Sequence, residues 1–153
     1  KADISTDEFL SMEQYPDADS VALVVATAEI QDRDPAAVLE EIGEYWIEFA
    51  LNSHYGDLLR ISGDTLPEIL MNLNNLHERI GQAFPNLDPP SFWCTDVAEN
   101  SLTLHYVSNR AGLTPMVAGL IKGLSNMLNA SCTVTQTVAL ADGAHHDEFL
   151  VTF

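Results

Sequence analysis

Residues 102–124, LTLHYVSNRAGLTPMVAGLIKGL, change their hydrophobic period midway, and this change decides the class of fold. Apolar residues occupy alternate positions at the beginning, which predicts a strand over Leu102–Val107. Thr114 is expected to cap a helix that has Pro115 in its first turn and reaches about Leu128. The chain therefore passes from strand to helix within one short connection.

The first half of the chain has the spacing of helices. A short helix is expected over Ser20–Ile30. Asp34-Pro35 predicts a second helix, because an aspartate can cap a helix and a proline fits its first turn. A third helix is expected to open at Asp64-Thr65 and to run to about Phe84, where Pro85 ends it.

The second half has β-like segments on both sides of the helix at Thr114. The expected strands are Phe92–Val97, Leu102–Val107, Cys132–Leu140 and Glu148–Phe153. Helices followed by antiparallel strands predict an α+β fold, in which an N-terminal helical half packs on a C-terminal antiparallel sheet of about four strands with one inserted helix. At 153 residues, the chain is expected to form one domain, residues 1–153.

The charge balance of the chain excludes whole classes of partner. There are 23 acidic residues and 6 basic ones, which give a net charge of −17. Nucleic acids and anionic membranes are bound through clusters of lysine and arginine, so neither is an expected partner. The acidity indicates a well-solvated surface or a basic protein partner. Cys94 and Cys132 are too few for a disulfide framework and are expected to be buried free thiols, as in a reducing cytoplasm.

His77 lies on the apolar stripe of the third helix, one turn after Leu73 and one turn before Ile80. Two interpretations fit this position. The histidine can be a core residue whose ring bonds a neighbouring carbonyl, which is the commoner role. It can also be a metal or heme ligand, because a neutral imidazole on an apolar helix face is a suitable proximal ligand for a buried heme iron.

Tyr106, Ser108 and Arg110 occupy every second position around the end of the predicted strand. On one strand they would share a face, with neighbours about 6.5–7 Å apart. They can be polar residues of a strand end that faces water, or an anion clamp in which the guanidinium pairs with a carboxylate beside two hydroxyls. Together with His77, the clamp indicates a ligand with a central metal and peripheral carboxylates. Heme, with its two propionates, is such a ligand.

The remaining histidines give weaker signals. His145-His146, flanked by Asp142 and Asp147, can form a metal site, but adjacent strand residues point to opposite faces, which favours a solvated loop. His54 and His105 have no partner pattern. The sequence contains no nucleophile elbow, phosphate loop or Cys-His nucleophile arrangement.

The run NLHERIGQAFPNLDPPSFWCTD (residues 75–96), followed by residues 102–124, resembles the heme-nitric oxide/oxygen-binding (H-NOX) family. That family includes the heme domain of soluble guanylate cyclase and stand-alone bacterial gas sensors. The resemblance covers nearly the whole chain, most clearly from Gly43 to Leu128, and the Tyr-x-Ser-x-Arg motif is its most specific element. Family domains open with about 25 further N-terminal residues, two helices that cover part of the distal face, and this chain is expected to lack them.

The resemblance implies a role for each candidate residue. It implies that His77 is the proximal iron ligand and that Tyr106, Ser108 and Arg110 hold the heme propionates. Pro90, which could also merely separate the helical and β halves, matches the family proline that distorts the porphyrin. The implied distal and wall residues are Trp46, Ala50, Leu73, Leu120 and Met116, the last at the position of a tyrosine in oxygen-binding members.

The function implied by the resemblance is a cytoplasmic b-type heme sensor, with heme buried between helices and sheet, that binds NO and CO and has no catalysis of its own. It would signal in trans to an enzyme such as a histidine kinase or a diguanylate cyclase. Two other hypotheses remain open from the sequence: a hydrolase that uses Ser108 with His77 or His105, and a heme-free interaction module that uses the acidic surface.

Overall fold

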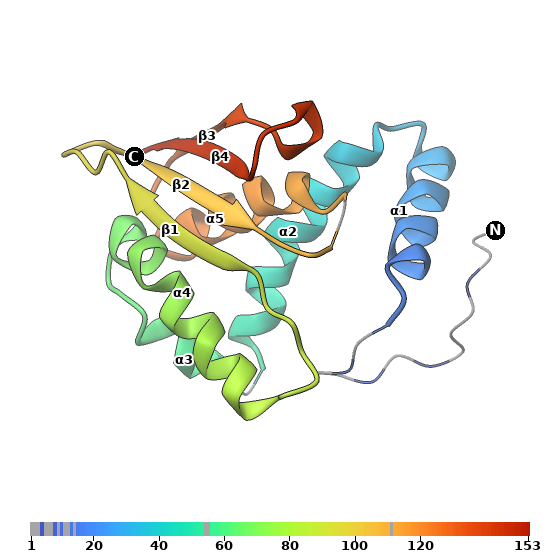
Figure 1. Cartoon of the computed structure of the whole chain (residues 1–153), viewed down its shortest axis with the longest axis horizontal. Helices are drawn as coiled ribbons and strands as arrows, with labels where there is room; N and C mark the ends of the chain where they lie inside the picture. Colours follow the sequence, from blue (N-terminus) through green and yellow to red (C-terminus); the bar gives the residue numbers. More distant parts are fainter. Residues whose placement is uncertain are drawn as a thin grey trace.

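The computed structural model describes residues 4, 8, 10, 13, 15–53, 56–110 and 112–153, and His54 lies outside these ranges. It confirms the α+β class: helices lead into an antiparallel sheet with strand order β1-β2-β4-β3, and one helix is inserted between the second and third strands (Figure 1). The elements are α1 (Asp17–Gln31), α2 (Pro35–Leu51), α3 (Gly56–Arg60), α4 (Leu66–Ala83), β1 (Ser91–Thr95), β2 (Ser101–Val107), α5 (Thr114–Met127), β3 (Thr133–Val138), the 3-10 turn η1 (Leu140–Asp142) and β4 (Asp147–Thr152).

Two of the long helices begin where the sequence predicts. The Asp34 carboxylate accepts a hydrogen bond from the Ala36 N–H at 3.2 Å and caps α2. Thr65 caps α4 in a capping box, in which the Glu68 carboxylate accepts from the backbone of Asp64 and Thr65 at 2.8 and 3.2 Å. These backbone donors lower the pKa of Glu68. The short helix α3 was not predicted, since five residues are too few to show a helical period.

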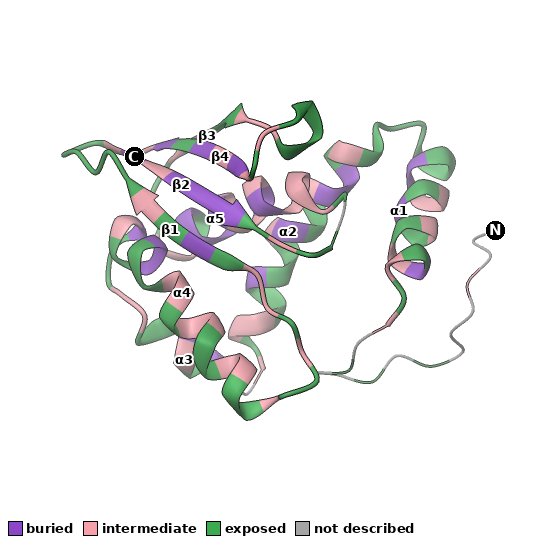
Figure 2. Ribbon diagram, viewed as in Figure 1, coloured by how far each residue is buried: buried purple, intermediate pink, exposed green. Residues whose placement is uncertain are grey.

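The sheet buries one of its faces against the helices. Phe92, Leu104, Tyr106 and Phe149 belong to the main core cluster, and in Figure 1 α2 and α5 lie behind the strands that carry them. Buried residues are concentrated on β2, β4 and the helices behind them (Figure 2). Because side chains alternate along a strand, the residues between these core positions face outward.

Helices α2 and α5 cross with almost no space between their backbones. A Cβ atom on Gly119 would overlap the Glu40 carbonyl oxygen, and one on Gly43 would overlap the Met116 carbonyl oxygen. Only glycine permits such an approach, because any side chain would hold the two backbones apart. Lys122 of α5 also forms an ion pair with Glu40 of α2. This crossing joins the helical half of the chain to its β half.

The role of Thr114 at the beginning of α5 differs from the sequence prediction. Thr114 is the first residue of the helix and not its cap, since the N-cap is Leu113 and makes no side-chain cap bond. The Thr114 hydroxyl instead donates to the buried Asp147 carboxylate at 3.1 Å. Asp147 also accepts from the Gln136 amide and the Leu140 N–H, each at 2.9 Å. This carboxylate ties the first turn of α5 to β4 and β3.

The remaining differences from the sequence analysis are small. The strand predicted over Phe92–Val97 ends at Thr95, and the one predicted over Cys132–Leu140 ends at Val138. Cys94 and Cys132 are free thiols as expected, but half-buried rather than buried, and burial raises the pKa of Cys94 to about 11.

Among the described residues, none of the helices has the length and hydrophobicity needed to cross a bilayer.

The helix crossing gives the first prediction. Gly119→Ala should lower the free energy of unfolding by about 1–3 kcal/mol or more, because the new methyl group forces α2 and α5 apart. Gly81→Ala in α4 is the control, since its new methyl group meets only the Pro89 ring, with Cγ at 3.3 Å, and its effect should stay within about 1 kcal/mol. Urea unfolding of both variants measures the difference, and equal stabilities would contradict the close crossing.

Candidate functional site

His77 is half-buried on the face of α4 that meets β1. Its ring nitrogen Nδ1 lies 2.8 Å from the Leu73 carbonyl oxygen, an acceptor, so Nδ1 carries the proton and donates it. In the neutral ring, Nε2 then holds a lone pair. Burial lowers the pKa of His77, although the bond to Leu73 acts in the opposite direction, so the ring is neutral at pH 7. A neutral imidazole of fixed tautomer can bind a metal ion through Nε2.

Asn74, one turn before His77, connects α4 to β1, the edge strand of the sheet. Its side-chain oxygen accepts a hydrogen bond from the Phe92 N–H of β1 at 3.2 Å, and its amide donates to Glu78 at 2.7 Å. The His77 ring consequently rests against the Phe92 ring, with centroids 5.2 Å apart. The hydrogen bond to the Leu73 carbonyl and the contact with the Phe92 ring together set the orientation of the His77 ring.

Phe92 also connects His77 to Tyr106. The Phe92 and Tyr106 rings have centroids 5.3 Å apart, and the two residues are paired between β1 and β2. Burial raises the pKa of Tyr106, and a hydrogen bond shared with the Ser108 side chain partly offsets this effect. The structure therefore brings the candidate metal ligand and the first clamp residue to the same, helix-covered face of the sheet.

Ser108 and Arg110 are not on the strand face that the sequence analysis expected. Strand β2 ends at Val107, so both residues lie in the turn that follows it. The Ser108 hydroxyl accepts from the Arg110 N–H at 3.1 Å, which holds the turn closed. The Arg110 guanidinium donates to Asp17, the first residue of α1, at 2.6 Å, and both side chains are nearly half exposed. Ser108 and Arg110 thus remain beside Tyr106, but through a turn and not through strand alternation.

The expected wall residues fall into three groups. Leu73 and Leu120 pack against the main core cluster that contains Tyr106 and Phe92. Met116 packs instead against the second cluster, between α1 and α2, which is composed of Val24, Ala28, Val38 and Leu39. Trp46 and Ala50 lie on α2, where Trp46 remains half exposed and contacts Phe49 at a centroid distance of 5.4 Å.

Pro90 is half-buried and directly precedes β1. Its neighbour Pro89 packs beside Gly81, one turn after His77 on α4. The two prolines therefore join α4 to the sheet close to His77.

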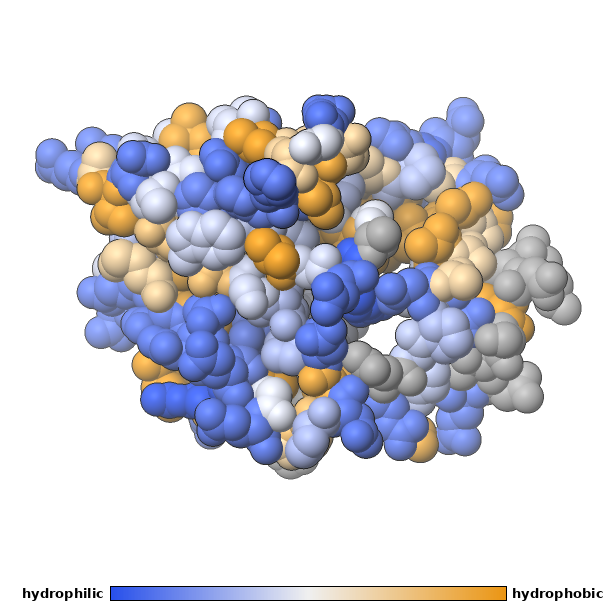
Figure 3. All heavy atoms as spheres, in the orientation of Figure 1, coloured by the Kyte–Doolittle hydropathy of each residue, from blue (hydrophilic) through white to orange (hydrophobic). Residues whose placement is uncertain are grey.

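Helix α2 also presents an apolar face that the described residues leave uncovered. Its members recur at helical spacing and are between 40% and 64% exposed; they are Ile42, Tyr45, Trp46 and Phe49. Isolated exposed apolar residues are ordinary, but a contiguous face of four large ones indicates something that covers it. In the space-filling view, an opening lies beside the N-terminal end of α1, between that helix and the remainder of the molecule (Figure 3).

The residues present fit a heme. His77 supplies one imidazole lone pair beside aromatic rings, as a proximal ligand requires. Tyr106, Ser108 and Arg110 supply hydroxyl and guanidinium donors for carboxylates. The uncovered apolar face of α2 suits a flat, apolar macrocycle. Among the described residues, the Asp17 carboxylate opposes this fit, because it already accepts from Nε of the Arg110 guanidinium that a propionate would need.

Sequence reasoning missed a second cluster of polar residues. His105, which has no partner pattern in the sequence, lies 2.9 Å from His146, and both rings lie near the Glu148 carboxylate. The two histidines are 41 residues apart, so no local sequence pattern indicates that they meet. His146 joins neither Asp142 nor Asp147 in this cluster, and Asp147 faces the opposite side of the sheet, where it holds Thr114.

Comparisons with known proteins show the family to which the chain belongs. A family model described as haem-NO-binding matches residues 1–136. Soluble guanylate cyclase gcy-31 of Caenorhabditis elegans is 32% identical over 125 residues, which are 82% of this chain and 18% of that protein. The beta-2 subunit of soluble guanylate cyclase from Rattus norvegicus is 35% identical over 89 residues, 58% of this chain and 13% of the relative. The chain spans less than a fifth of these curated relatives, so their cyclase activity does not transfer to it.

Solved structures show the same fold. An H-NOX protein from S. oneidensis in the Fe(II) ligation state, a triple mutant, superposes with a TM-score of 0.88 over 99% of this chain and 80% of that one, at 16% identity. An unliganded Fe(II) H-NOX mutant from K. algicida superposes with a TM-score of 0.81 over 95% of this chain and 77% of that one, at 23% identity. Sequence match and fold together confirm the resemblance, and the chain belongs to the haem-NO-binding (H-NOX) family of heme-based gas-sensing domains, which sense rather than catalyse.

Proposed function

We propose that this domain binds heme b through His77 and senses NO and CO. The observation that carries the proposal is the tautomer of His77, because the bond from Nδ1 to the Leu73 carbonyl leaves Nε2 as a metal-binding lone pair on a half-buried ring. When bound, the heme iron supplies the position at which a diatomic gas is captured. Tyr106, Ser108 and Arg110 would hold the propionates, and Trp46, Ala50, Leu73, Pro90, Met116 and Leu120 would surround the macrocycle.

The two other hypotheses have less support. A hydrolase would need a histidine beside Ser108, but the contacts described for the Ser108 hydroxyl are with Tyr106 and the Arg110 backbone. His77 bonds Leu73, and His105, next to Tyr106 on β2, faces the opposite side of the sheet. A heme-free interaction module that uses the acidic surface would leave the exposed apolar face of α2 unexplained.

Helix α4 offers a route for a signal. His77 and Asn74 face the sheet from α4, while Glu78 and Arg79 on the same turns are exposed. A change in the bond made by His77 would therefore act on a helix whose other face is open to a partner. With a net charge of −17, that partner would present a basic surface, and a histidine kinase or a diguanylate cyclase acting in trans from the cytoplasm remains our expectation.

The proximal ligand is tested by His77→Gly. The wild type should purify with, or take up, one heme and show a Soret band, whereas the variant should lose heme or keep it only when imidazole replaces the missing ring. Because a bound ligand stabilises the native state, the heme-free variant should also melt at a lower temperature than the wild type. Undiminished heme and an unchanged ferrous spectrum without imidazole would contradict the assignment. A colourless wild type that refuses hemin would instead favour the heme-free module.

The clamp is tested by Arg110→Ala. Loss of a charge-assisted hydrogen bond costs about 1.5–3 kcal/mol, so heme affinity should fall by roughly one to two decades. Hemin titration followed by absorption measures this change.

Two control variants separate the clamp from ordinary surface contacts. Asp17→Asn removes the charge of the ion-pair partner but leaves the guanidinium, so heme affinity should be unchanged or higher. Asn109→Ala removes an exposed bond to Asp88 and should have little effect on heme. If Arg110→Ala and Asp17→Asn weaken heme equally, the ion pair with α1, and not a propionate clamp, is what matters.

The last prediction here concerns gas selectivity. Bound O₂ is retained well where a distal donor hydrogen-bonds to it, and the family's tyrosine position is Met116 in this chain, whose thioether is only a weak acceptor. The reduced protein should bind NO and CO but retain no O₂ in air. The visible spectrum after admission of air measures this. A persistent oxygen-bound spectrum would contradict it, and Trp46→Phe would then show whether the indole N–H is the donor.

A further inference from the structure

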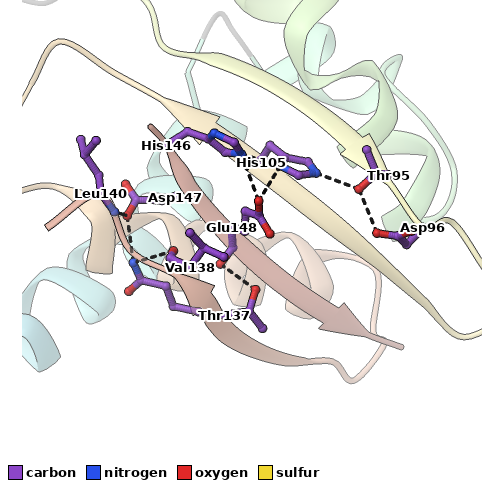
Figure 4. Close-up of polar contacts among 10 residues, drawn as sticks. Thr95, Asp96, His105, Thr137, Val138, Leu140, His146, Asp147 and Glu148 are labelled. Carbon is purple, nitrogen blue, oxygen red and sulfur yellow. Dashed lines mark hydrogen bonds and ion pairs between the residues drawn. The ribbon is translucent and has the colours of Figure 1, made fainter. Parts of the chain in front are cut away.

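A second polar cluster lies on the outer face of the sheet, away from His77. His105 of β2 is paired across the ladder with Glu148 of β4, and His146 precedes β4 by one residue. His146 and Glu148 are two positions apart and share a face, which is the face opposite Tyr106. Figure 4 shows the two imidazole rings and the Glu148 carboxylate converging on one point.

The three ligand-type atoms form a compact triangle. His105 Nδ1 lies 2.9 Å from His146 Nε2, His146 Nε2 lies 3.1 Å from Glu148 Oε1, and His105 Nδ1 lies 3.6 Å from the same oxygen. Two ligands that are each about 2.0–2.1 Å from a tetrahedral zinc ion are roughly 3.3–3.4 Å apart. The observed sides bracket this value, so an ion fits with movements of a few tenths of an ångström.

The proton on His105 is directed away from this triangle. Thr95 Oγ1 donates to the Asp96 carboxylate at 3.1 Å, so its single proton is already committed. The bond of 2.7 Å between Thr95 Oγ1 and His105 Nε2 must then be donated by Nε2. In the neutral ring, Nδ1 therefore points a lone pair at His146 and Glu148. A hydrogen bond that fixes the second nitrogen in this way is the usual support of a metal-binding histidine.

The surroundings of the triangle also favour a cation. The Trp93 ring stacks on His105, with centroids 4.8 Å apart and planes 3° apart, and restricts the orientation of the imidazole. The side chains of His146 and Glu148 are 24% and 26% exposed, which leaves access from solvent. Two imidazoles and one carboxylate are ligands that suit zinc and similar transition metals better than calcium or magnesium.

We propose that His105, His146 and Glu148 form a binding site for a divalent transition-metal ion of the zinc class, separate from the heme site. His105 Nδ1, His146 Nε2 and a Glu148 oxygen supply three ligands, once the proton that His146 Nε2 donates to His105 Nδ1 has moved to the other ring nitrogen of His146, and water completes the coordination. Thr95 and Trp93 are positioning residues, since they orient His105 without touching the ion. The site ties β2 to the beginning of β4 and does not depend on whether His77 binds heme.

The test is a calorimetric titration of the purified, chelator-treated protein with Zn²⁺, with the heme content recorded by visible absorption. The wild type should bind one ion in this site. His146→Gln and Glu148→Gln should each weaken binding by more than about tenfold, and Thr95→Val, which removes the support of His105, should weaken it about 10–100-fold. Circular dichroism confirms that each variant is folded, and Glu148→Gln serves if a histidine variant is not.

Two controls make the result specific. His145→Gln alters the exposed neighbouring histidine, which is not in the triangle, and should bind Zn²⁺ as the wild type does. His77→Gly should also retain Zn²⁺ binding while it loses heme, which separates this site from the proposed gas sensor. The proposal is overturned if the wild type binds no ion, or if His145→Gln loses as much affinity as His146→Gln.

Discussion

The contact on which the rest of the structure depends is the crossing of α2 and α5. Gly43 and Gly119 allow two backbones to touch, and a side chain at either position would separate the helical half of the molecule from its β half. With this crossing closed, α5 lies behind the sheet, and its first turn is bound by the buried Asp147 carboxylate. The inward face of β2 is thereby covered, and Tyr106 is buried toward α4 and His77.

The sheet separates two kinds of chemistry that are adjacent in the chain. Tyr106 points inward to Phe92 and the candidate heme site, while His105, one residue earlier, points outward to His146. Since neighbouring strand residues face opposite sides, β2 contributes Tyr106 to the candidate heme site and His105 to the proposed metal site on the other face. A gas-binding site and a metal site can then exist in one small domain without sharing a ligand.

Much of the fold could be predicted from the sequence, because its signals are local. Asp34 and Thr65 cap helices through bonds to residues two or three positions away, and the apolar stripe around His77 repeats within one helix. The arrangement of the candidate site was only partly predictable. Alternation placed Tyr106, Ser108 and Arg110 on one strand face, but the pairing of β2 with β4 stops at Tyr106 and its pairing with β1 stops at Val107. The residues remain close because the Ser108 hydroxyl closes the turn.

The sequence alone determined the caps of α2 and α4, the α+β order of elements and the family motif, since each depends on residues that are near in the chain or share one helix. Only the tertiary structure decided which distant side chains meet. Arg110 pairs with Asp17 across 93 positions, and His105 meets His146 across 41. Such pairs leave no periodic trace in the sequence, because they depend on how strands are ordered and how closely two helices pack.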